Sequence, residues 1–205
     1  MKQFLLLFIF ISHFFPAFGQ KPVPKWDAAT LAKANTAKDE KYLSKQEKEV
    51  IFYLNLVRLN PKLFAETYLE KYLDSTKEND TYTKSLLKEL PLTKPMGLLM
   101  PDKELFTFTK EHAIKSGQQN TTGHGNYKER VKKIRPRFGG YIAENCDYGN
   151  NRAIDIVMSL LIDENVPSLG HRKNILNPIY KFTGTSIQPH KGFEWNCVME
   201  FGGAQ

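Results

Sequence analysis

Beyond its first nineteen residues, this 205-residue sequence has no apolar stretch long enough to cross a bilayer. It also has no internal repeat, no HExxH motif and no comparable peptidase motif. Cysteine is scarce, with only Cys146 and Cys197, so the chain can form one internal disulfide at most. These absences exclude a membrane-spanning protein and a repeat array, and they make a peptidase the less favoured hypothesis.

Residues 1–19 are an apolar leader. Lys2 is its lone charge, an apolar run extends from Phe4 to Ile11, and the segment ends in Ala17-Phe18-Gly19. This pattern is typical of a cleavable secretory signal peptide. It predicts cleavage before Gln20 and a secreted or periplasmic protein. No cysteine follows the apolar run, so no lipid anchor is expected.

Export bears on the cysteines and on the charge. In an oxidising compartment a pair of cysteines is usually bridged, and we expect a Cys146–Cys197 disulfide that contributes about 4 kcal/mol. The formal net charge of +7 suits an anionic partner such as a cell-wall polymer or acidic lipid head groups. Solubility alone explains the same charge more simply.

The first half of the exported chain indicates an arm followed by helices. Residues 20–43 are rich in Lys, Ala and Pro and predict a flexible N-terminal arm, so that 44–205 form one domain. Ser44 and Glu47 fit a capping box that starts a helix over 45–59. Asn60 and Pro61 start the next helix, and Asp102 starts one that ends near 119. Residues 74–100 indicate a connection with one helical turn near Leu86 and Leu87.

The second half combines a long loop, a buried helix and strands. Residues 120–140 indicate a loop and 141–145 a short strand. The nearly all-apolar segment 154–162 predicts a buried helix. The alternating segments 182–188 and 194–201 predict a hairpin. The fold class is therefore α+β, a three-layer α-β-α sandwich around a small, mainly antiparallel sheet.

Five short motifs carry a resemblance to a known family. They are GHGN (123–126), AEN (143–145), GHRKNILNP (170–178), FTGTSI (182–187) and WNCVMEFGG (195–203). With NLVRLNPKLFAETYL (55–69) they resemble the CAP superfamily (cysteine-rich secretory, antigen 5 and pathogenesis-related proteins; SCP-like), especially its bacterial secreted members. The resemblance covers roughly 45–203 and implies an α-β-α sandwich.

The resemblance also implies a site. The cleft of the family carries two histidines and two acids that can hold a divalent metal, and the motifs place His124, Glu144 and His171 in it. The second acid is Asp163 or Glu164. These two lie about 100° apart at the end of the buried helix, so the sequence leaves the choice open. Zn²⁺ or another divalent cation would suit these donors.

Three functions remain open for these cleft residues. Binding is favoured: a lipid, a sterol or an anionic cell-envelope fragment, following a theme of the family. A metal-dependent hydrolase with Glu144 as general base is the alternative. The four side chains also satisfy one another as a plain hydrogen-bonded network. Cys146 as a nucleophile paired with a histidine is disfavoured by the expected disulfide.

A basic run lies between His124 and Glu144. It is either a solvated loop or an anion-binding lip near His124. Its members are Lys128, Arg130, Lys132, Lys133, Arg135 and Arg137. Nucleic acid is not expected, because no aromatic residues are interleaved with these charges and the chain is exported.

Other positions are interpreted as structural. His112 and His190 are assigned structural or surface positions, and Arg172 and Asn174 are expected to brace the loop 163–178. The sequence departs from the family at Leu160 or Leu161, where a tryptophan is expected. The C-terminal cysteines of the animal relatives are absent, so no cysteine-rich module is inferred.

Overall fold

The computed structural model describes residues 25–203, and the predicted signal peptide lies outside this range. The larger helices are α2 (Lys45–Leu59), α4 (Glu70–Thr76), α5 (Thr81–Glu89), α6 (Lys103–Gln119) and α8 (Ala153–Ile162). The shorter ones are α1 (Ala28–Ala34), α3 (Pro61–Phe64), α7 (Tyr127–Arg130) and α9 (Gly170–Ile175). Single turns lie at η1 (Ala65–Leu69), η2 (Leu90–Leu92) and η3 (Arg135–Phe138).

A four-stranded sheet forms the centre, in the order β1-β3-β4-β2. The strands are β1 (Met100–Pro101), β2 (Ile142–Tyr148), β3 (Tyr180–His190) and β4 (Glu194–Gly203). The short β1 runs parallel to β3, and the other pairs are antiparallel. The predicted hairpin and the mainly antiparallel sheet are therefore confirmed, and β2 lies at one edge.

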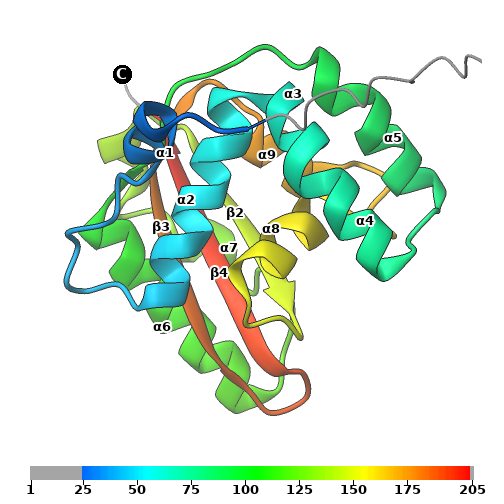
Figure 1. Ribbon diagram of the computed structural model, residues 1–205. Coiled ribbons are helices and arrows are strands. Elements are labelled where there is room, and N and C mark those ends of the chain that lie inside the picture. Colours follow the sequence, from blue (N-terminus) through cyan, green and yellow to red (C-terminus); the bar gives the residue numbers. More distant parts are fainter. Residues whose placement is uncertain (1–24, 204–205) are drawn as a thin grey trace, which may run out of the picture.

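Helices cover both faces of this sheet (Figure 1). On one face α2 and α8 pack against the sheet, where Leu54, Ile156 and Met199 share one buried cluster. On the other face lies α6, whose Leu105 packs with Phe138 in a separate cluster. The three-layer α-β-α sandwich predicted from the sequence is confirmed.

Helix α2 begins and ends on polar contacts that tie it to the fold. Ser44 and Glu47 form the predicted capping box, each accepting from the backbone N–H of the other. Near the other end, Arg58 is fully buried, and burial lowers its pKa to about 10. Its guanidinium donates to four backbone carbonyls, those of Gly97, Ile175, Asn177 and Tyr180. Arg58 thus fixes the loop before β1 and the start of β3 to α2.

The described part of the predicted N-terminal arm is docked rather than flexible. Within 25–43, α1 is capped by Asp27, and Ala34 and Leu43 are buried. Trp26 Nε1 donates to Thr67 Oγ1 at 2.9 Å. Its large apolar residues are too widely spaced to show helical periodicity, but Trp26 and Leu31 pack against the main core and Leu43 lies in a smaller cluster.

Helix α5 is longer than the single helical turn expected near Leu86 and Leu87, and Asp80 caps it. Two shorter helices lie in segments expected to be loops. Helix α7 lies within 120–140, and α9 lies within the polar stretch 163–178. Helices of one or two turns present too few apolar positions for periodicity to reveal them.

The predicted Cys146–Cys197 disulfide is wrong. Cys146 pairs with Val198 and Cys197 with Asp147 in the β2–β4 register. Since successive side chains alternate between faces, the two thiols point to opposite sides of the sheet. Both cysteines are free and buried, Cys146 beside Ala113 and Cys197 in the core beneath α2 and α8.

We expect Gly184→Ala to destabilise the protein by about 1–3 kcal/mol or more. A Cβ at Gly184 would overlap the backbone of Leu105 and Phe106, which cannot move without lifting α6 from β3. Gly97→Ala is the control, because a Cβ there meets only the flexible end of Lys181 at 3.4 Å. Urea denaturation measures both variants. Equal stabilities would contradict the close approach of α6 to the sheet.

We also expect both cysteines to be free thiols in the purified protein. Without reductant, a thiol reagent should label both after unfolding and neither in the native state, because both are buried. Intact-mass analysis counts the labels. If the unfolded chain takes up no label without reductant, the two cysteines form a disulfide and this expectation is wrong.

Candidate functional site

The carboxylate of Glu144 is the centre of a buried polar cluster between β2 and α6. Its side chain is 1% exposed. His124, which is half-exposed, donates from Nδ1 to Glu144 Oε1 at 3.0 Å. Burial alone would raise the pKa of Glu144. The hydrogen bonds from His124 and Arg130 outweigh burial and hold the pKa below its ordinary value. Glu144 is therefore a carboxylate stabilised by its neighbours.

Arg130 is the principal neighbour of Glu144. Its Nη2 lies 2.8 and 2.7 Å from the two carboxylate oxygens and also donates to the carbonyl of His124. The guanidinium lies over the rings of Phe108 and Tyr127, at 4.9 and 5.4 Å from their centroids. Helix α7, which carries both Tyr127 and Arg130, is thereby fastened over the cluster.

A second carboxyl group, Glu200, lies opposite Glu144 on β4. Burial and the negative charge of Glu144 raise the pKa of Glu200 well above its ordinary value. Tyr127 donates its hydroxyl to Glu200 Oε1 at 2.6 Å. Arg130 balances the negative charge of Glu144.

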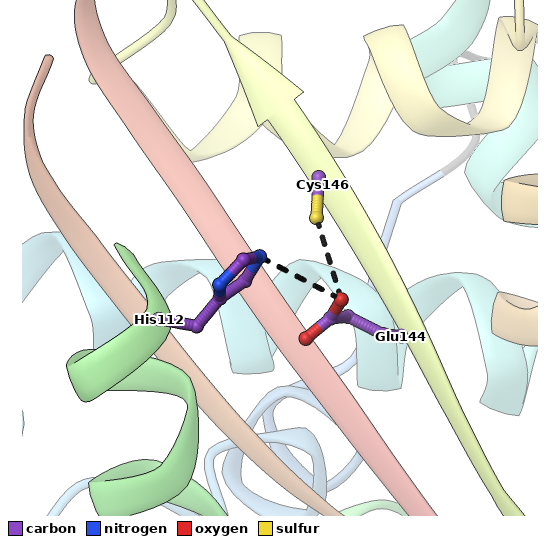
Figure 2. A group of neighbouring side chains, drawn as sticks. All are labelled: His112, Glu144 and Cys146. Carbon is purple, nitrogen blue, oxygen red and sulfur yellow. Dashed lines mark hydrogen bonds and ion pairs between the residues drawn. The ribbon is translucent and has the colours of Figure 1, made fainter. Parts of the chain in front are cut away.

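His112 and Cys146 complete the cluster, and Figure 2 shows both of them directed at one oxygen of Glu144. His112 Nε2 lies 3.9 Å and Cys146 Sγ 3.8 Å from Glu144 Oε1. Burial lowers the pKa of His112 and raises that of Cys146 well above its ordinary value, so both are neutral. Together the three side chains form a buried group that can hold a metal ion.

The other predicted pair, Asp163 and His171, is joined by its own hydrogen bonds. Asp163 ends α8 in the left-handed region at φ 60°, which turns its side chain toward the start of α9. Its Oδ1 accepts from His171 Nδ1 at 2.7 Å, and Oδ2 accepts from the backbone N–H groups of His171 and Arg172. Nε2 of a neutral His171 is left with a free lone pair.

Glu164, the alternative second acid, is exposed and reaches only its neighbour Asn165. The geometry thus favours Asp163 as the acid that serves His171. Arg172 is fully buried and donates to the carbonyls of Leu161 and Ile162, which braces the 163–178 stretch as expected.

The Asp163–His171 pair borders one pocket, and neighbours of the His124–Glu144 pair, His112 and Arg130, border another. A pocket of about 450 Å³ is bordered by Asp163, His171 and Asp147, whose pKa burial raises to about 6. A larger pocket of about 690 Å³ lies on the α6 side. Gly123 lies between the two: its carbonyl accepts from His112, and its N–H donates to Tyr148 at the edge of the smaller pocket. Among residues 25–203, no hydrogen bond or ion pair joins one His/acid pair to the other.

The larger pocket is bounded by α6 and by the segment 121–134. Phe108 and Ile134 supply apolar surface, and Lys115 and Lys133 supply exposed charge. Arg130 forms part of its wall.

The members of the basic run have different partners. Arg130 is held by Glu144, Arg137 by Asp102 at 2.6 Å, and Lys132 by Glu129 at 2.6 Å. Arg135 donates to the carbonyl of Gly140, Lys128 is exposed, and Lys133 alone of these six lines the larger pocket without a carboxylate partner in the described chain. Half of the run thus stabilises the fold of this segment.

Sequence reasoning missed three members of the Glu144 cluster. His112 was assigned a structural or surface role, Arg130 a role in the lip, and Glu200 none. The register of the β4 hairpin against β2 would have pointed to Glu200, since it fixes which residues face one another. His112 and Arg130 arrive from other elements, and no local spacing connects them to Glu144. His190 is structural as expected and bonds to the carbonyl of Thr121.

We expect Asp163→Asn to lower the free energy of unfolding by about 1–3 kcal/mol, because the charge that accepts three hydrogen bonds at the start of α9 is lost. Glu164→Gln is the matched control, and a change within about 0.5 kcal/mol is expected for this exposed side chain. Chemical denaturation compares the two. A larger loss at Glu164 would reverse the choice of acid.

Comparison with known proteins gives two findings. The family model for the cysteine-rich secretory protein family, CAP, matches residues 51–201. Among solved structures, an outer surface protein from Borrelia burgdorferi is similar, with 22% sequence identity and a TM-score of 0.43, over 68% of this chain and 95% of that chain. Comparison with curated proteins gives no match. Because the family model spans most of the sequence, the chain belongs to the CAP family of cysteine-rich secretory proteins.

Proposed function

We propose that this CAP domain is a non-catalytic binding module for an anionic, lipid-like ligand. The observation that carries the proposal is the pocket of about 690 Å³ between α6 and the segment 121–134. A pocket of this volume is typical of sites for small molecules.

The chemistry of the pocket suits an apolar chain with an acidic head. Phe108 and Ile134 offer apolar contact inside, while Lys115 and Lys133 are exposed at its border. Neither lysine has an ion-pair partner in the part of the chain that the structure describes. Of the two carboxylates at the border, Glu129 is neutralised by Lys132, which leaves Glu111 against the two lysines. The local field therefore favours an anion.

Hydrolysis with a metal is the weaker alternative. A hydrolase needs a metal-activated water, a general base and the substrate at one point. Here Glu144 already forms an ion pair with Arg130, and the Asp163–His171 pair borders a different pocket. These features support binding over catalysis.

The site of action that we propose is outside the cytoplasm. Support comes only from the signal-peptide pattern of residues 1–19. No helix among residues 25–203 is long and apolar enough to span a membrane. An exported domain of this kind would meet lipids, sterols or acidic envelope fragments as free or presented ligands.

Oleate tests the proposal, with oleyl alcohol as its uncharged analogue. We expect oleate to bind and the double variant Lys115→Glu/Lys133→Glu to weaken it at least about tenfold, because two cations at the border become anions. Oleyl alcohol should bind the parent more weakly than oleate does, and its affinity should change little in the variant. Isothermal titration calorimetry gives the dissociation constants.

The control is Lys84→Glu/Lys88→Glu on α5, which makes the same change in net charge on an element that does not line the pocket. Its oleate affinity should match that of the parent. A parent that does not bind oleate, or a control that loses as much affinity as the pocket variant, would contradict the proposal.

A further inference from the structure

We propose that His112, Glu144 and Cys146 form a latent site for a thiophilic divalent metal ion such as Zn²⁺, and that Arg130 competes with the metal for Glu144. This inference does not depend on the lipid pocket. It concerns two donors, His112 and Cys146, that lie outside the His/acid set implied by the family motifs.

The donor geometry is close to that of a zinc site. Zinc bonds to nitrogen, oxygen and sulfur at about 2.0–2.3 Å, so tetrahedral ligands lie about 3.3–3.6 Å from one another. Glu144 Oε1 lies 3.9 Å from His112 Nε2 and 3.8 Å from Cys146 Sγ. The donor atoms of His112 and Cys146 lie within 4.8 Å of each other, so these two must approach by up to about 1 Å to surround one ion with Glu144. Figure 2 shows both side chains directed at the same oxygen of Glu144.

The chemistry of the donors also fits. An imidazole nitrogen, a carboxylate oxygen and a thiolate sulfur are a mixed set that suits zinc better than calcium or magnesium, which prefer oxygen. All three side chains are buried, so the ion would be shielded from competing water. A buried cation would also stabilise the deprotonated form of Cys146.

Arg130 supplies the positive charge that a metal ion would otherwise bring to Glu144. Its Nη2 lies within 2.8 Å of both oxygens of Glu144, so a metal on Oε1 would bring two positive centres together. His112 has a second obstacle, since Nε2 donates to the carbonyl of Gly123 at 3.0 Å and must lose that proton to bind a metal. Arg130 must move first, because it carries the opposing charge.

Arg130 can leave Glu144 if the short helix that carries it moves. Helix α7 has four residues and is fastened to the cluster mainly by Arg130 on Glu144 and Tyr127 on Glu200. When the guanidinium leaves, Glu144 still accepts from His124, but the buried carboxylate loses the cation that balances its charge and then needs another. Removing the guanidinium should therefore turn a latent site into an occupied one.

Co²⁺ and Zn²⁺ binding to the whole exported chain test the competition. In Arg130→Met, which retains the apolar stem against Phe108 and Tyr127, we expect Co²⁺ affinity at least about tenfold higher than in the parent. A thiolate-to-cobalt charge-transfer band should appear, and Zn²⁺ should raise the melting temperature of the variant more than that of the parent. Arg130→Lys, which keeps a cation, should fall between the two.

The double variant Arg130→Met/Cys146→Ala separates this site from any other. It should lose the charge-transfer band and the stabilisation by Zn²⁺. Arg130→Met protein that folds only when Zn²⁺ is supplied would support the proposal. A variant that stays unfolded with Zn²⁺, or that folds and binds Co²⁺ no better than the parent and without the band, would overturn it.

Discussion

The register of β2 against β4 is the constraint on which both candidate sites depend. Glu144 faces Glu200, and Cys146, two residues further along β2, faces Val198. Because side chains alternate along a strand, these residues point toward α6, while Asn145 and Asp147 point toward α8 and α9. A slip of one residue would exchange the two sets and destroy both sites.

The same alternation explains why the polar residues of the cleft form two groups. On the α6 side the carboxylate of Glu144 is surrounded by two imidazoles, a thiol and a guanidinium, with the carboxyl group of Glu200 opposite, and Arg130 balances its charge. On the α8 side Asp163 ends one helix and caps the next, so the acid that orients His171 also fixes the chain that carries it. Each pair therefore stabilises the fold and also belongs to a candidate site. The larger pocket is lined by apolar side chains of α6 and of the segment 121–134, and exposed lysines supply its positive charge. Neither His/acid pair lines it.

Most of the fold could be predicted because its signals are local. The capping box at Ser44, the cap at Asp102 and the alternation in the final hairpin each depend on residues within a few positions of one another. Helices α7 and α9 were not expected because they are too short for a period to show. The disulfide failed for a different reason. An even number of cysteines says nothing about which face of a sheet each one occupies.

The sequence by itself determined the family and the three-layer architecture, and it placed Asp163 or Glu164 near His171, since a proline turn brings them together. The structure decided that the acid is Asp163. Only the tertiary structure decided what surrounds Glu144. His112 comes from α6, Arg130 from α7 and Glu200 from β4, and these elements meet at Glu144 only after the sheet has formed and α6 has packed on it. Contacts between distant elements are set by register and packing rather than by spacing along the chain. For that reason the buried ion pair that balances the site could not be read from the motifs that identified it.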